Sequence, residues 1–253
     1  MFEFGGSNPQ LTTCRPDVME ATFVGIPLGT INELCPNIVN ATVVSVCVTN
    51  RDVNRFSGRR LQLIVCKLAN LRITNDKLVG LIVYNQIERN TNIVIKSGAA
   101  LRTLEITSAL CSNRCSLITT VDSEVRLRLL SIRQPTSVSI TAVADILILS
   151  NVVVYQHCQL IAPVCAVLYQ VKAESGIDFK IVTPNMWSRF ASDVKTAQLD
   201  IGRHRFRNTR RITADLMTGT QEWIKFIEYV NFICNLNDTL IDALFAAQED
   251  MHM

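Results

Sequence analysis

The residues of this chain best suited to binding chemistry form a run of five arginines with an interleaved histidine and phenylalanine. The run comprises Arg203, His204, Arg205, Phe206, Arg207, Arg210 and Arg211. Guanidinium groups neutralise phosphates with release of counterions, and an aromatic ring among them can stack on a base. The run therefore predicts contact with nucleic acid or another polyanion. Three other partners fit its charge: an anionic lipid surface, an acidic segment of a neighbouring subunit, and the chain's own acidic residues 212–253. The alternative without an external partner is a solvated connector whose charge is balanced by those acidic residues.

A second group of arginines surrounds Phe56, nearer the N-terminus. The group consists of Arg51, Arg55, Arg59 and Arg60. Asn and Asp side chains between these arginines can bond the local backbone, and a glycine follows them, so residues 50–58 are predicted to form a loop between two strands. Such a loop could grip phosphates, and the alternative is an ordinary basic hairpin loop without a ligand.

A metal site would have to be built from cysteines and one histidine. The best constellation pairs Cys111 and Cys115 with His157, Cys158 and Cys165 far downstream. Structural zinc needs four ligands, usually in closely spaced pairs, and the second group here lies beside an apolar run. We therefore expect buried or incidental cysteines and no metal, although zinc binding by these five residues stays an open alternative.

Patterns of catalytic residues are missing from the sequence. It contains three histidines and none of the nucleophile-elbow, phosphate-loop, zinc-protease or dinucleotide-binding patterns. Asp145 is the most conspicuous carboxylate within an apolar run, and we expect it to pair with an arginine or mark a bulge, because no second carboxylate near it suggests acid–base work. We predict no catalytic residue and no cofactor. A cysteine- or zinc-dependent enzyme is the alternative.

Charge is distributed unevenly along the 253 residues. The formal net charge is only +3, and 48% of residues are apolar, which is a globular composition. Residues 51–133 carry 14 basic against 6 acidic side chains, residues 189–211 carry 7 against 2, and residues 212–253 carry 1 against 7. The small total thus hides two basic blocks and an acidic end, which favours a protein with charged partners over one with a small substrate.

The compartment is inferred from the cysteines and the N-terminus. The chain has nine cysteines, and most of them lie among apolar residues, so no disulfide framework is needed and a reducing cytoplasmic or nuclear setting, or a virion, is expected. The N-terminus does not resemble a signal peptide. Polar residues break the most apolar region, 138–169, into pieces too short for a transmembrane helix, and peripheral membrane contact remains open.

The elements that must position these residues fall into three segments. Residues 1–19 are predicted to be an extended arm, residues 20–182 a β-rich body of short strands in a sandwich or barrel, and residues 183–253 a helical region packing on the body or on a neighbour. An α+β fold is the alternative, and no internal repeat is apparent. Strict alternation over residues 124–129 places Arg126 and Arg128 on one strand face and Val125, Leu127 and Leu129 on the other.

Helical spacing of apolar residues predicts a helix over 184–198 and one or two more beyond residue 218. The second region carries the candidate subunit contacts Trp223, Phe226, Ile227 and Val230. Such a stripe either covers a face of the β body or docks on another subunit.

These observations favour a non-enzymatic structural protein. We expect it to self-associate into a homo-oligomer through its arm and C-terminal helices and to contact a polyanion through its arginines, a description that a viral capsid, triplex or matrix-type subunit would fit. The alternatives are a nucleic-acid-binding carrier or regulatory module, and the cysteine or zinc enzyme.

Overall fold

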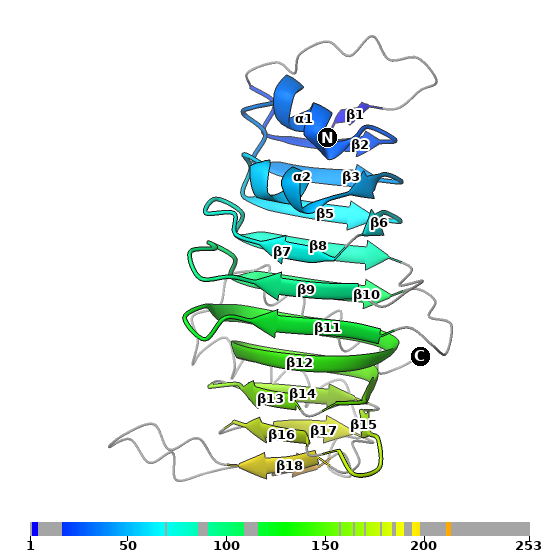
Figure 1. Cartoon of the computed structure of the whole chain (residues 1–253), viewed down its shortest axis with the longest axis vertical. Helices are drawn as coiled ribbons and strands as arrows, with labels where there is room; N and C mark the ends of the chain where they lie inside the picture. The colour runs from blue at the N-terminus through cyan, green and yellow to red at the C-terminus, as the bar shows by residue number, and fades with distance from the viewer. Residues whose placement is uncertain are drawn as a thin grey trace.

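The chain winds into a parallel β-solenoid whose coils stack along one axis (Figure 1). The computed structural model describes residues 2–4, 17–68, 70–85, 91–108, 116–156, 158–163, 165–169, 171–177, 179–183, 186–189, 194–197 and 211–213. Of these residues, 57% form strands and 9% form helices. The expectation of a β-rich body is confirmed, but the predicted sandwich or barrel is wrong, because each strand pairs in parallel with the equivalent strand of the next coil.

Most strands belong to two faces of the solenoid, which we call the first and second sheets. The first sheet is formed by β1 (Phe2–Phe4), β2 (Glu20–Val24), β3 (Asn40–Val44), β5 (Arg60–Ile64), β8 (Gly80–Asn85), β10 (Thr103–Ser108), parts of β12 (Arg126–Val154), β14 (Cys165–Tyr169), β17 (Met186–Arg189) and β19 (Arg211–Thr213). The second sheet is formed by β7 (Leu71–Ile73), β9 (Thr91–Ile95), β11 (Ser116–Val121), the middle of β12, β13 (Cys158–Ile161), β16 (Phe179–Val182) and β18 (Val194–Ala197). Short strands β4 (Cys47–Val48), β6 (Lys67–Leu68) and β15 (Lys172–Ala173) make further pairings at a corner.

A repeat of 20 residues organises the first coils. Glu20, Asn40, Arg60 and Gly80 occupy equivalent positions in β2, β3, β5 and β8, and the next coils are longer, reaching Thr103 and Leu129. Equivalent inward-facing residues stack into two buried columns. The columns are Ala21, Ala41, Leu61, Leu81, Leu104, Leu130 and Phe23, Val43, Leu63, Val83, Ile106, Ile132. The sequence therefore does contain an internal repeat.

Backbone hydrogen bonds fix where each coil of the first sheet begins and ends. The carbonyl of Met19 accepts from the N–H groups of both Val39 and Asn40, and equivalent pairs of bonds recur at the start of the next four coils. At the other end of the strands, Gly25, Ser45 and Val65 have φ values of 70°, 59° and 51°. Their N–H groups donate to carbonyls of the next coil, those of Val44, Ile64 and Tyr84 respectively. The turn after each strand thus demands a left-handed residue at 20-residue intervals.

The second face begins with helices and continues with strands. Short helices α1 (Leu28–Leu34) and α2 (Asn50–Arg55) stand above β7 and β9 in Figure 1. The predicted loop over residues 50–58 is wrong in its first part, because Thr49 and Asp52 form a capping box that starts α2. Asn50 and Asn54 of α2 bond the backbone of Arg72 and Thr74, so α2 covers the open edge of β7.

The first sheet differs between its upper coils, β2 to β10, and its lower coils, from β12 onward. Outward-facing residues of the upper coils other than Gly80 are exposed or half-buried. In the lower coils the residues that alternate with the core are buried as well and lie outside the core cluster, namely Leu129, Ile146, Ile148, Cys165 and Val167. The outer face of the first sheet is therefore open above and covered below.

The predictions for the two ends of the chain have different outcomes. Of the predicted arm, Phe2–Phe4 pairs with β2 of its own chain as a further strand. The predicted helix over 184–198 is wrong, because β17 and β18 lie there and pair with β14 and β16. The structure gives no support to a C-terminal helical region: residues 211–213 are also a strand, and the remaining residues from 198 to 253 lie outside the described part.

Candidate binding groove

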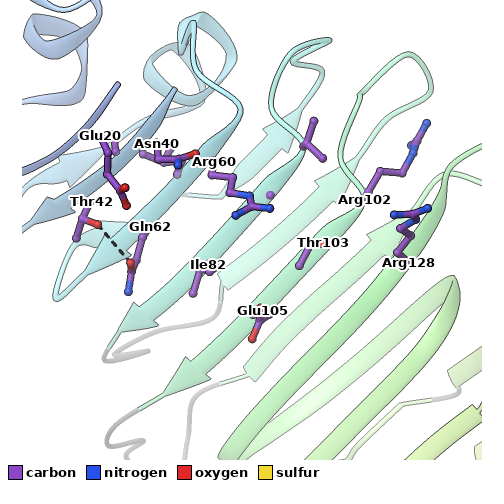
Figure 2. A pocket seen from close by; sticks show the side chains of 14 residues that line it. Glu20, Asn40, Thr42, Arg60, Gln62, Ile82, Arg102, Thr103, Glu105 and Arg128 are labelled. Atoms are coloured by element: carbon purple, nitrogen blue, oxygen red, sulfur yellow. Dashed lines mark hydrogen bonds between the residues drawn. The ribbon is translucent and has the colours of Figure 1, made fainter. Parts of the chain in front are cut away.

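A groove of about 420 Å³ lies on the outer face of the upper coils and extends to the start of β12 (Figure 2). Side chains at one end of β2, β3, β5, β8, β10 and β12 line it. Its polar and charged lining residues are Glu20, Asn40, Thr42, Arg60, Gln62, Arg102, Thr103, Glu105 and Arg128. Because the strands are in register, these residues form columns that cross the coils at about 4.8 Å per coil. Concave surfaces of this kind are the usual binding surfaces of solenoid proteins.

Three arginines, Arg60, Arg102 and Arg128, lie along one side of the groove and form what we call the arginine row. Arg102 and Arg128 hold equivalent positions on adjacent coils, while Arg60 starts β5 two coils above Arg102. All three are exposed, and Figure 2 shows them near the same ends of the strands. No carboxylate forms a salt bridge with any of them within the described residues. Like charges stacked at this spacing repel, and an anionic partner would relieve that repulsion.

Glu105 stands on the floor of the groove. Burial raises the pKa of Glu105 above its ordinary value of 4.5, and the nearby Arg133 guanidinium opposes that shift. Arg133 is itself buried and donates through Nε to Ser131 Oγ at 3.1 Å. The raised pKa makes Glu105 easier to neutralise than a surface glutamate, which reduces its repulsion of an anion beside the arginine row.

Gly80 leaves room between the arginines. It is buried beside the side chain of Arg60, and a Cβ placed at this position would meet Arg60 Cγ at 3.5 Å. Thr42 and Gln62 hydrogen-bond across adjacent coils at 3.3 Å and fix the upper part of the groove wall. Arg102 is also positioned, since its Nη1 donates to the carbonyl of Leu101 at 3.1 Å.

The structure separates the predicted arginines around Phe56. Arg51 and Arg55 lie on α2, whereas Arg59 and Arg60 precede and begin β5, and only Arg60 lines the groove. Phe56 is buried in the core and cannot stack on a ligand. Gly58 is required beside it, since a Cβ there would lie 2.6 Å from the Phe56 ring. The predicted phosphate-gripping loop is thus dispersed over two faces.

Most of the other predicted arginines and contact residues fall outside the described part. Arg211 begins β19, and nothing else is described of the run from Arg203 to Arg210. Trp223, Phe226, Ile227 and Val230 also lie outside the described residues. Contact through these residues with a polyanion or a subunit stays a prediction.

Arg102 and Arg128 line the groove but were not predicted to be site residues. Arg126 and Arg128 were predicted to face outward, and both are exposed, while Val125 and Leu127 lie in the core as predicted. Leu129 was predicted to share the core face, but it is buried on the outer face, outside the core cluster. That Arg128 lies near Arg102 and Arg60 follows from the register between coils, which the sequence of one strand does not show. The signal that could have shown it is the spacing of apolar residues at equivalent positions, which places Arg102 and Arg128 in one column.

The cysteines and Asp145 show no catalytic arrangement among the described residues. Cys66, Cys158 and Cys165 are buried and form no disulfide. Burial raises the pKa of the Cys158 thiol, whose Sγ accepts from the Ile140 N–H at 3.0 Å. Within the described part, no three His, Cys, Asp or Glu residues could hold a metal together, and Cys111, Cys115 and His157 lie outside that part.

Asp145 and Cys35 each test one expectation from the sequence. Asp145 pairs with Arg126 in a salt bridge, as expected for a carboxylate in an apolar run. Cys35 is disulfide-bonded, so the expectation of reduced cysteines does not hold there. The compartment remains a prediction.

Two further findings bear on identity. No helix in the described residues is long and apolar enough to span a membrane. Comparison of the chain with protein-family models, curated proteins and solved structures finds no match.

Proposed function

We propose that this protein is a non-enzymatic binding scaffold that contacts an anionic partner through the arginine row of its groove. The observation that carries the proposal is the alignment of Arg60, Arg102 and Arg128 on one exposed face without carboxylate partners in the described residues. Arginines held on rigid strands are preorganised for carboxylates or phosphates, because the guanidinium presents a fixed fork of donors. A solenoid can offer such residues to an extended ligand over several coils.

The test is a binding titration with the full chain. The probes are a fluorescein-labelled poly-glutamate peptide of about 16 residues and a single-stranded DNA of about 16 nucleotides, each at about 50 and 200 mM salt. The groove variant is Arg60→Gln/Arg102→Gln/Arg128→Gln. Its control, Arg51→Gln/Arg55→Gln/Arg72→Gln, removes the same charge from exposed arginines that do not line the groove.

The proposal expects wild-type affinity to fall as salt rises, and the groove variant to bind at least about tenfold more weakly than wild type at low salt. The control should stay within about twofold of wild type. Equal losses in both variants would mean that binding follows net charge alone. If the wild type binds neither the poly-glutamate peptide nor the DNA, the proposal is overturned.

A further inference from the structure

The exposed apolar residues of the upper coils gather beside the groove. Val24, Val65 and Tyr84 are three of the four large apolar residues that are exposed within the described part of the chain. Val24 ends β2 on the outer face, Tyr84 is the last residue but one of β8, and Val65 follows β5 directly. The half-buried side chains of Val44 and Ile64 lie between them in the same register. These five residues form what we call the apolar column.

The apolar column and the arginine row lie at opposite ends of the strands of the first sheet. The column runs over β2, β3, β5 and β8, and the row lies at β5, the start of β10 and β12, so β5 carries residues of both. Positions along a strand rise about 3.3 Å per residue. The column at Tyr84 therefore stands about 17 Å from Val79, the position equivalent to Arg102 and Arg128. The polar side chains of Thr42, Gln62 and Glu105 lie between the two. The upper face thus offers a basic side, a polar floor and an apolar side.

Val65 has a backbone conformation that its side chain does not favour. Its φ is 51°, in the left-handed region, where β-branched residues are strained, and 61% of its surface is exposed. Equivalent positions in the preceding coils carry Gly25 and Ser45, which fit that region better or are smaller. An exposed valine gains little from burial in the free protein, so folding alone does not account for this residue. Contact with an apolar partner would.

We infer that the anionic partner of the proposed function is an acidic amphipathic segment of a polypeptide, laid across the upper coils. Its carboxylates meet the arginine row and its apolar side chains cover the apolar column. A helix is about 10 Å wide and fits between the two sides, and the five coil spacings from β2 to β12 span about 24 Å, equivalent to about 16 helical residues. Apolar faces of helices dock on proteins in this way.

Charge complementarity favours a polypeptide over a nucleic acid. The groove also holds Glu20, which would repel a continuous phosphate backbone but can face an uncharged position of a peptide. The apolar column has no counterpart on a sugar–phosphate chain. The inference rests on the proposed function, since it names the partner class for the same groove.

The test compares three peptides of equal length, about 16 residues each, and a single-stranded DNA of similar charge. One peptide is acidic and amphipathic with leucines on one face, the second has serine in place of each leucine, and the third keeps the leucines with glutamine in place of each glutamate. Full-length wild type is measured beside the apolar variant Val24→Thr/Val65→Thr/Tyr84→Thr. Threonine preserves the β-branched shape at positions 24 and 65, and the three residues are exposed, so the fold should be kept.

A matched control carries Val94→Thr/Ile118→Thr/Val143→Thr, three half-buried outward positions on the second sheet. We expect wild type to bind the acidic amphipathic peptide at least about tenfold more tightly than either other peptide. For the serine peptide this factor corresponds to the loss of about 50 Å² or more of apolar contact. The apolar variant should lose this preference and keep its affinity for the acidic serine peptide, while the control resembles wild type.

Each contrary outcome has a separate meaning. Equal wild-type affinity for the leucine and serine peptides would overturn the inference and leave the proposed function standing. Tighter binding of the DNA than of every peptide would identify a nucleic acid as partner and also overturn it. Loss of all binding, including that of the acidic peptides, would reject the proposed function itself.

Discussion

The outer face of the first sheet is open in the upper coils and covered in the lower ones, although the strands pair in the same way throughout. In the upper coils the outward positions hold Glu20, Thr42, Gln62 and Glu105, and in the lower coils equivalent outward positions hold apolar side chains such as Ile146 and Ile148. The strand ladder therefore does not decide which part of the solenoid can bind a partner. The outward-facing side chains do, because the mostly polar outward residues of the upper coils leave that face in contact with water, with the apolar column at one end of it, whereas the apolar outward residues of the lower coils are buried.

The largest expected effect on stability comes from placing a charge at two outward isoleucines, one on the covered face and one on the open face. Ile148→Glu places an unpaired charge on the covered outer face and should cost about 4 kcal/mol of unfolding free energy, or prevent folding. Ile82→Glu places the same charge in the open groove and should cost about 1 kcal/mol or less. Urea unfolding followed by circular dichroism measures both. Equal costs would show that the two faces are not different environments.

A second prediction concerns the helical face of the upper coils. Asn75 is buried, donates to the carbonyls of Val53 and Phe56 at 2.8 and 2.9 Å, and accepts from the N–H groups of Lys77 and Leu78. Asn75→Ala leaves these backbone groups unpaired and should cost about 3 kcal/mol of unfolding free energy.

Its control is Asn50→Ala, which removes one exposed bond to the Arg72 N–H and should cost under about 1 kcal/mol. If the two variants unfold at the same urea concentration, Asn75 does not hold α2 to the coil below it.

A third prediction compares left-handed residues in the upper and lower coils. Val65→Gly relieves backbone strain at φ 51° and should raise the unfolding free energy by about 1 kcal/mol, despite the greater freedom of glycine in the unfolded chain. Asn151 has nearly the same φ, 53°, but asparagine tolerates it, so Asn151→Gly should change stability by less than about 0.5 kcal/mol. Thermal unfolding of both variants checks this, and a destabilised Val65→Gly protein would contradict it.

The smallest expected effect is a pH dependence at Glu105. Because its pKa is raised in the folded protein, the ionised carboxylate destabilises the fold, and stability is lost as pH rises from 4.5 through the folded pKa. Glu105→Gln removes this loss. The variant should be more stable than wild type at pH 7, with the difference vanishing below pH 4.5, in unfolding curves measured at several pH values. A difference that stays constant with pH would indicate a purely packing effect.

Strand positions could be predicted from the sequence, whereas their stacking could not. Alternation over residues 124–129 correctly placed Leu127 in the core and Arg128 outside. The same alternation occurs in sandwiches, barrels and solenoids, so it carries no information about which strand is the neighbour. The 20-residue period does show which strands are neighbours, but the period is lost after Gly80, where the coils lengthen.

The helices and the groove show the same limit. α1 has Pro27 at its N-cap and no side-chain capping bond, so the usual start signal is missing. For residues 184–198, Trp187 and Val194 have helical spacing but form strands, because pairing with β14 and β16 outweighs local preference. Arg60 was a predicted contact residue, yet its association with Arg102 depends on coil register alone.

The paired hydrogen bonds at Met19, Val39, Arg59 and Val79 recur at equal intervals of the chain. Adding or removing one interval of 20 residues in the upper coils would shift every later side chain by one coil and turn none of them to the other face. The length of the binding face is therefore adjustable in steps of about 4.8 Å. A solenoid of this design can be matched to a longer or shorter partner by duplication of one coil, without a new fold.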